Sequence, residues 1–313
     1  MPLWIETPLI ESVPMGLSIG KKVRLKLENV QPASSFKLRG IGALCEYEAA
    51  RGAKGFTCAT TGSAGYALAW AGRELGLPAV ICAPDTMPKE SIRPIQLAGQ
   101  TVEPAGHTWY DADERAAALA AERGYTHIST NEHPVLWHGI STIVDELAAQ
   151  GEKPDTILCS VGSGGLISGL CEGLVRNGWG DVRLIGCGTY GANAYSLAIE
   201  AGKVITIENT TSIIPCISAL HVINHVMDFK DSVSLQSFLT TDIGAVTACE
   251  RFLDDHRLLV DPSCGVALAP LYENAPVLRD SQNIIVIVCG GVGITVEKLG
   301  RMKALAVKQE EPA

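Results

Sequence analysis

The sequence lacks the features that define several protein classes. It contains no uncharged apolar run of 18 residues, as a membrane-spanning helix needs, and its start lacks the basic and then apolar segments of a signal peptide. Lys and Arg are not clustered, and 34 acidic residues against 25 basic ones give a net charge of −9. We therefore expect a soluble, cytoplasmic protein with no nucleic-acid partner and no membrane partner.

Cysteine pairs at metal-binding or redox spacing are also absent. The ten cysteines include no C-x-x-C pair, and several lie inside apolar runs such as ILCSV and VIVCG, so we expect reduced, buried thiols. No internal repeat, low-complexity segment or Ser/Pro-rich linker occurs. A chain of 313 residues that is 47% hydrophobic should form one large or two moderate domains with a substantial core.

Short β-rich runs alternate along the chain with segments whose apolar residues recur at helical spacing. The predicted strands are 56–59, 79–83, 101–103, 156–161, 183–187 and 284–289. The predicted helices are 64–75, 88–97, 112–123, 140–149, 166–177 and 241–254. Since such alternation is typical of parallel strands joined by helices, we predict an α/β fold with parallel-rich sheets flanked by helices.

Glycine-rich turns directly follow three of the predicted strands. They are TTGSAG at 60–65, SVGSGGL at 160–166 and CGGVG at 289–293. In open α/β sheets, ligands bind beyond the carboxyl ends of the strands. These three turns are therefore the candidate ligand sites.

The turn formed by Gly162, Ser163, Gly164 and Gly165 is the strongest single motif. Glycines allow backbone N–H groups to converge on an anion, and the positive end of the following helix also favours a phosphate. A tight turn with no ligand is the alternative. No Lys-Ser/Thr follows the last glycine, as a nucleotide-binding P-loop requires, and the G-x-G-x-x-G spacing of dinucleotide-binding folds is missing. These absences favour a phosphorylated cofactor over a nucleotide.

Lys37 lies in the segment PASSFKLRG, between an aromatic residue and a glycine. A lysine in an apolar setting can have a lowered pKa and form a Schiff base, although most lysines are simply exposed. Combined with a phosphate-binding turn, the Schiff-base interpretation is the better one.

Five motifs resemble those of a known family. PASSFKLRG at 32–40, TTGSAG at 60–65, SVGSGGL at 160–166, DPSCGVALA at 261–269 and VIVCGG at 286–291 are similar, in this order, to motifs of the serine/threonine dehydratases. These enzymes use pyridoxal phosphate and have the tryptophan-synthase-β (type II) fold. The short serine dehydratases, which have no regulatory domain, are the most similar. The resemblance therefore implies a pyridoxal-phosphate lyase that removes water from a β-hydroxy amino acid, L-serine or L-threonine by default.

The resemblance also assigns roles to residues. It makes Lys37 the catalytic lysine that binds the cofactor, with Phe36 beside the cofactor ring and Cys289 as the neutral partner of the pyridine nitrogen. The cofactor phosphate falls on Gly162, Ser163, Gly164 and Gly165. The substrate carboxylate falls on Thr60, Thr61, Gly62, Ser63 and Ala64. No metal ligand is implied, and the spacing of His221 and His225 is that of a possible pair without a third ligand.

Several positions depart from the family pattern. Ser63 replaces an asparagine that contacts the cofactor, Gly188 replaces a glutamate, and Asn131 and His138 replace residues around the pocket wall. We include Asn131 and His138 among the candidate substrate-binding residues. The departures leave other reactions open: elimination from another β-substituted amino acid, β-replacement, racemisation, or a catalytically silent paralogue that binds pyridoxal phosphate.

Domain organisation and assembly follow from the resemblance alone. It implies a large cofactor-binding domain formed by residues 1–36 and 140–313, and a small mobile domain formed by residues 37–139. It also implies a homodimer.

Overall fold

Two separate sheets organise the chain in the computed structural model, which describes residues 1–60, 62–85 and 87–310. The larger sheet has the strand order β1-β2-β10-β7-β8-β9, and all of its neighbours are parallel except β1 and β2. Its strands are β1 (Leu9–Glu11), β2 (Lys22–Lys26), β7 (Thr156–Ser160), β8 (Arg183–Thr189), β9 (Ser234–Thr240) and β10 (Asn283–Ile287).

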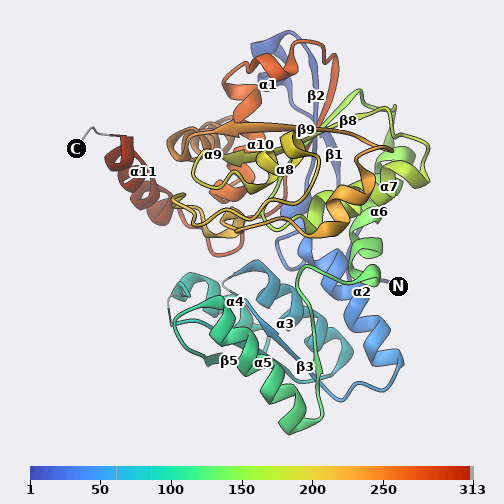
Figure 1. The fold of residues 1–313 in the computed structure, drawn as a ribbon, viewed down its shortest axis with the longest axis vertical. Coiled ribbons are helices and arrows are strands. Elements are labelled where there is room, and N and C mark those ends of the chain that lie inside the picture. Colours follow the sequence, from blue (N-terminus) through green and yellow to red (C-terminus); the bar gives the residue numbers. More distant parts are fainter. Residues whose placement is uncertain (61, 86, 311–313) are drawn as a thin grey trace.

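The smaller sheet is entirely parallel and has the order β5-β4-β3-β6. Its strands are β3 (Phe56–Ala59), β4 (Ala79–Ala83), β5 (Thr101–Pro104) and β6 (Thr126–His127). Three helices pack on this sheet: α3 (Ser63–Leu75), α4 (Lys89–Leu97) and α5 (Trp109–Arg123). In Figure 1 this unit lies below the larger one.

The remaining helices belong with the larger sheet or between the two sheets. They are α1 (Val13–Ile19), α2 (Lys37–Ala50), α6 (Pro134–Gln150), α7 (Gly165–Arg176), α8 (Ala194–Ala201), α9 (Asp242–His256), α10 (Pro262–Tyr272) and α11 (Val296–Glu310). Short 3-10 helices are η1 (Glu28–Val30), η2 (Pro215–Ile217), η3 (Asn224–Phe229) and η4 (Pro276–Leu278). Helix α2 packs against both α3 and α6, so it joins the two units (Figure 1).

All the predicted strands and helices occur, with shifted ends. Strands β3 and β4 have the predicted bounds, whereas β8 extends to Thr189 and β10 ends at Ile287. Helix α6 begins six residues earlier than predicted, at Pro134, because the His133 side chain accepts a hydrogen bond from the Val135 N–H and caps the helix. The prediction of an α/β fold with parallel-rich sheets is confirmed.

The sequence pattern did not predict several elements, each for a physical reason. Helix α2 contains Gly40 and Gly42 and has no strong apolar face, because it is buried against more than one neighbour. Helix α10 is buried over almost its whole length, so it has no polar face to give a helical period. Strand β2 contains Arg24 and Lys26, whose charged side chains are buried.

The cysteines are free, as expected, but one prediction about them is wrong. Nine of the ten are buried, whereas Cys216, the middle residue of η2, is exposed. Among the described residues, no helix combines the length and apolar character needed to cross a membrane.

The expected domain boundaries coincide with helices. The boundary between residues 36 and 37 is the start of α2, and the boundary between residues 139 and 140 lies inside α6. All four strands of the smaller sheet lie within residues 37–139.

Candidate functional site

The three glycine-rich turns follow the carboxyl ends of β3, β7 and β10, and two of these strands, β7 and β10, are neighbours in the larger sheet. A pocket lies there. Residues from distant parts of the chain line it: Ser35, Phe36, Lys37, Ser63, Asn131, Ser160, Gly162, Ser163, Gly164, Gly165, Cys216, Asp261, Ser263, Cys289 and Gly290.

The turn from Gly162 to Gly165 forms a cradle of backbone N–H groups at the start of α7. Among the described residues, no protein group accepts a hydrogen bond from these four N–H groups. A Cβ atom on Gly162 would lie 2.6 Å from the Cys216 carbonyl oxygen. Gly164 has a φ of +103°, and a Cβ atom there would lie 2.6 Å from Val226 Cγ2. Free donors at a helix N-terminus suit a phosphate group, and only glycine fits at these two positions.

The segment that carries Lys37 is joined to the end of β10. The Phe36 N–H donates to the Cys289 carbonyl at 3.0 Å, and the Gly291 N–H donates to the Ser34 carbonyl at 3.1 Å. Ser34 has a left-handed φ of 53°. This turn directs the chain into α2, whose first residue is Lys37. The lysine therefore lies beside the carboxyl end of β10, in the same pocket as the glycine cradle.

The environment of Lys37 favours its neutral amine. Burial lowers the pKa of the amine, and the thiols of Cys216 and Cys289 oppose this effect more weakly. The Nζ atom lies 5.3 Å from the centre of the Phe36 ring. A neutral lysine amine can act as a nucleophile towards a carbonyl group and can accept a proton.

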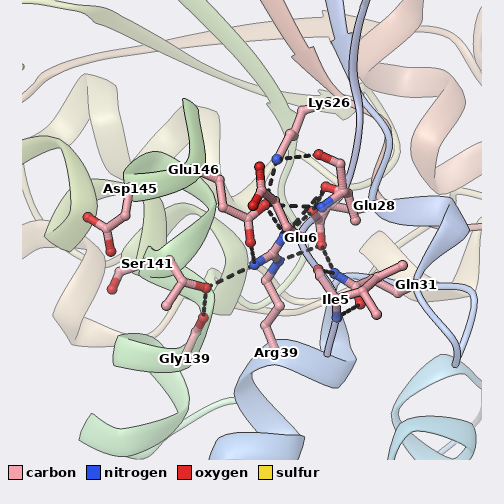
Figure 2. Close-up of polar contacts among 12 residues, drawn as sticks. Ile5, Glu6, Lys26, Glu28, Gln31, Arg39, Gly139, Ser141, Asp145 and Glu146 are labelled. Carbon is pink, nitrogen blue, oxygen red and sulfur yellow. Dashed lines mark hydrogen bonds and ion pairs between the residues drawn. The ribbon is translucent and has the colours of Figure 1, made fainter. Parts of the chain in front are cut away.

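A buried ion network holds the first turn of α2 (Figure 2). Arg39 donates to both carboxylate oxygens of Glu28, at 2.8 and 2.7 Å, and to both oxygens of Glu146, at 2.6 and 2.7 Å. Lys26 Nζ donates to Glu146 at 2.5 Å and to the Thr7 carbonyl at 2.8 Å. Because Arg39 is two residues beyond Lys37, the network fixes the lysine-bearing turn against β2 and α6.

Cys289 is buried, lines the pocket and is uncharged. A hydrogen bond with the Cys264 thiol, together with burial, raises the pKa of the Cys289 thiol well above its usual value. The Ser160 hydroxyl donates to Cys289 Sγ at 3.4 Å. Cys289 therefore presents a neutral thiol to the pocket.

The smaller sheet contributes to the pocket through the turn that follows β3. The Thr60 hydroxyl accepts a hydrogen bond from the Gly62 N–H at 3.0 Å, and helix α3 begins at Ser63. Ser63 lines the pocket, whereas Ala64 is buried beneath the turn. Thr61 lies outside the described residues. A helix start with this geometry can bind a carboxylate.

Two other candidate substrate-binding residues lie in different places. Asn131 lines the pocket, next to the cradle. His138 is exposed on α6 and does not line the pocket. The reason is that Gly139 faces α2, where a Cβ atom would lie 2.4 Å from the Arg39 carbonyl, so His138 points away from this contact.

Sequence reasoning did not assign a role to five polar residues of the pocket: Ser35, Ser160, Cys216, Asp261 and Ser263. Asp261 caps α10 by accepting hydrogen bonds from the N–H groups of Ser263 and Cys264, and burial raises the pKa of its carboxyl group. Its position before a proline at a helix start was a usable signal. Nothing in the sequence around Cys216 indicated its position.

A cradle for phosphate and a lysine with a lowered pKa, in one pocket at the carboxyl edge of a parallel sheet, define an enzyme that binds a phosphorylated carbonyl cofactor. Comparison with known proteins gives the particular family. Residues 1–290 match the family described as "Pyridoxal-phosphate dependent enzyme", and the chain belongs to this family. Its cofactor is pyridoxal phosphate, whose phosphate suits the four free N–H groups of the cradle.

Individual relatives are similar over nearly the whole chain. A human "Serine dehydratase-like" protein is 36% identical, covering 96% of this chain and 94% of the relative. A human "L-serine dehydratase/L-threonine deaminase" is 37% identical, covering 96% and 95%. The crystal structure of a fungal L-serine ammonia-lyase from Rhizomucor miehei superposes with a TM-score of 0.90 at 28% identity, covering 98% of this chain and 100% of that one. The type II fold of these enzymes is confirmed.

Proposed function

We propose that this protein is a pyridoxal-phosphate lyase that removes water from a β-hydroxy amino acid, L-serine or L-threonine by default, giving a 2-oxo acid and ammonia. The observation that carries the proposal is the pocket itself, in which the Lys37 amine and the free N–H groups of the glycine cradle line one cavity. Relatives named as serine dehydratases and threonine deaminases support the reaction and the substrate class.

The residues of the pocket have complementary roles in this proposal. Gly162, Ser163, Gly164 and Gly165 hold the cofactor phosphate through their N–H groups. Lys37 anchors the cofactor, Phe36 lies beside its ring, and the Cys289 thiol faces its ring nitrogen. Since this thiol is uncharged, it does not stabilise a proton on that nitrogen, which favours prompt elimination over transamination.

The substrate is held on the other side of the pocket. The turn from Thr60 to Ala64, which includes Thr61, Gly62 and Ser63, binds its carboxylate, and Asn131 contacts the substrate. When bound, the cofactor withdraws electrons from the bonds at the substrate α-carbon. When the substrate's amine takes its place, the freed Lys37 Nζ, whose pKa is lowered by burial, would accept the α-proton.

The pocket lining favours one alternative. Ser63 and Asn131 both line the cavity and both depart from the dehydratase pattern. A pocket with these polar groups fits a larger or more polar β-substituted amino acid, on which the same scaffold would perform elimination, replacement or racemisation.

We also propose that residues 37–139 form a small domain that moves relative to residues 1–36 and 140–313, and that the protein is a cytoplasmic homodimer. The confinement of the smaller sheet to residues 37–139 supports the division. Ten free cysteines are consistent with a reducing compartment.

One experiment tests the proposed function directly. The purified protein is mixed with pyridoxal phosphate, and its absorption spectrum is followed while L-serine, L-threonine and other β-substituted amino acids are added. We expect a cofactor absorption band, its shift on addition of L-serine or L-threonine, and release of 2-oxo acid. A Lys37→Ala variant is the matched control and should show neither a stable band nor turnover. A shifted band without 2-oxo acid would favour the alternative, and no band in the wild type would contradict the proposal.

A further inference from the structure

His225 lies behind the glycine cradle, between two carboxylates. On η3, its Nδ1 atom is 3.0 Å from Asp228 Oδ2, and its Nε2 atom is 3.1 Å from Glu172 Oε1 on α7. The imidazole ring stacks on the Trp137 indole of α6, with centroids 3.9 Å apart and planes 19° apart. Phe229 contacts the imidazole with its edge, at 4.9 Å between centroids.

The protonation state of His225 follows from these contacts. A carboxylate can only accept a hydrogen bond, and a neutral imidazole can donate only one. Both contacts are therefore satisfied at once only by the imidazolium form, which also interacts favourably with the face of an indole ring. Glu172 from α7, Asp228 from η3 itself and the uncharged Trp137 from α6 are the groups that face the ring.

The same segment supports the cradle from behind. The Ile223 N–H, at the start of η3, donates to the Ser163 carbonyl at 2.8 Å. Val226 lies against Gly164, where a Cβ atom would come within 2.6 Å of its Cγ2 atom.

Trp137 connects the cluster to the pocket wall. Its indole N–H donates to the Asn131 carbonyl at 2.9 Å. That carbonyl in turn lies next to Gly165, 3.5 Å from the position of an added Cβ atom. The ring stacked on His225 thus holds the wall beside the last residue of the cradle.

We propose that His225, as an imidazolium held between Glu172 and Asp228, is a positioning residue for the glycine cradle, so that affinity for pyridoxal phosphate falls when His225 loses its proton. The proposal rests on the assignment of the cradle to the cofactor phosphate. Loss of one proton leaves one carboxylate facing a ring nitrogen without hydrogen, which weakens the attachment of η3 to α7.

The test measures the dissociation constant of pyridoxal phosphate from pH 6 to pH 9 by titrating the cofactor-free protein and following the cofactor absorption band. Wild type is compared with His225→Gln and His225→Arg. The cofactor's own titration affects all proteins equally. The ratio of a variant's dissociation constant to that of wild type therefore reports only the effect of the substitution. We expect His225→Gln to bind pyridoxal phosphate about threefold more weakly than wild type at pH 6 and equally at pH 9, the size expected for partly exposed ion pairs.

His225→Arg supplies the opposite comparison. Arginine stays charged over this range, stacks on indole and donates to two carboxylates, so this variant should keep tight binding at pH 9. If the His225 variants unfold, Glu172→Gln tests the same contact, because it removes one of the two carboxylates that face His225. It should also weaken cofactor binding at pH 6. His221→Gln changes an exposed histidine in the same segment and serves as a control. Its dissociation constant should equal that of wild type at every pH.

Two results would overturn the proposal. A ratio for His225→Gln that is the same at every pH would mean that His225 only stabilises the fold. A ratio of one throughout would mean that it does not influence the cradle. If wild type shows a normal cofactor band in either case, the proposed function stands and only the role of His225 is lost. If wild type shows no band at any pH, both proposals fail.

Discussion

Arg39 and Glu28 form a two-point ion pair that is completely buried: Nε lies 2.8 Å from Oε2, and Nη2 lies 2.7 Å from Oε1. Burial alone would lower the pKa of Arg39, but the carboxylates of Glu28 and Glu146 raise it above its usual value. Two residues before Arg39, the chain carries Lys37 into the pocket. The same helical turn is therefore anchored by a salt bridge at one position and supplies the reactive amine at another.

Removing the cation of this pair should strongly destabilise the fold. Arg39→Met leaves the buried carboxylate of Glu28 without its cationic partner, and losing one partner of a buried pair costs about 3 to 5 kcal/mol. Urea unfolding of wild type and variant measures this difference. The control is Arg301→Met, which removes surface ion pairs with Glu297 on α11 and with Glu90 on α4 and should cost about 1 kcal/mol or less. A cost below 1 kcal/mol for Arg39→Met would show that the network is not needed to hold α2.

The network should also make the free energy of unfolding depend on pH in the acidic range. Although burial raises the pKa of Glu146, hydrogen bonds and charge from Arg39 and Lys26 lower it below its usual value of 4.5 overall. The contribution of Glu146 is therefore fully present above pH 4.5 and is lost as the pH falls below it. We expect Glu146→Gln to be less stable than wild type at pH 7 and to lose less further stability between pH 5 and pH 3.5. Equal losses for the two proteins in urea unfolding at these pH values would contradict this; Glu297→Gln serves as the exposed control.

A side chain in the glycine cradle should weaken cofactor binding. Gly164→Ala places a Cβ atom 2.6 Å from Val226 and forces alanine into a φ of +103°, so the free N–H groups must move. We expect the dissociation constant of pyridoxal phosphate to rise at least about tenfold, equivalent to about 1.4 kcal/mol. Gly178→Ala is the matched control, because Gly178 also has a positive φ, +67°, but an added Cβ atom meets nothing within 4 Å. Similar cofactor affinities for the two variants would mean that Gly164 does not shape the phosphate site.

The lowered pKa of Lys37 predicts how the cofactor-free protein reacts. Burial shifts the titration of the amine to lower pH, so its reactive neutral form appears below the usual lysine value of 10.5. The rate at which the cofactor band forms on adding pyridoxal phosphate should rise with pH and level off below pH 10.5. Stopped-flow absorption measures this rate, and Lys37→Arg provides the baseline. A rate that still rises above pH 10.5 would show an amine with an ordinary pKa.

Some elements could be predicted from the sequence, and others could not. Strands β3 and β4 were predicted with their bounds because their short apolar runs are delimited by glycine and proline. Helix α2 was not predicted, although it carries Lys37, because Gly40 and Gly42 break the helical pattern. Packing requires the glycine at position 40, because a Cβ atom there would lie 2.8 Å from Leu136 Cγ. Local pattern detects amphipathic elements and misses those that are buried on several sides.

The candidate site likewise contains residues that the sequence motifs predicted, whereas another predicted residue lies outside it. Lys37, the glycine cradle and Cys289 all line the pocket, as their motifs suggested, whereas His138 is exposed. The rotation of α6 about its axis, set by the contact of Gly139 with Arg39, decides which of its residues face the pocket. Sequence spacing alone does not fix that rotation.

The sequence by itself determined the alternation of strands and helices over much of the chain and the three glycine-rich turns, because backbone freedom at glycine and the period of apolar residues are local properties. It also singled out Lys37, through the motif in which this residue lies. Only the tertiary structure brought Glu28, Arg39 and Glu146 into one buried network and stacked Trp137 on His225. These contacts join residues far apart in the chain. Their existence depends on how whole helices pack, which no local pattern specifies.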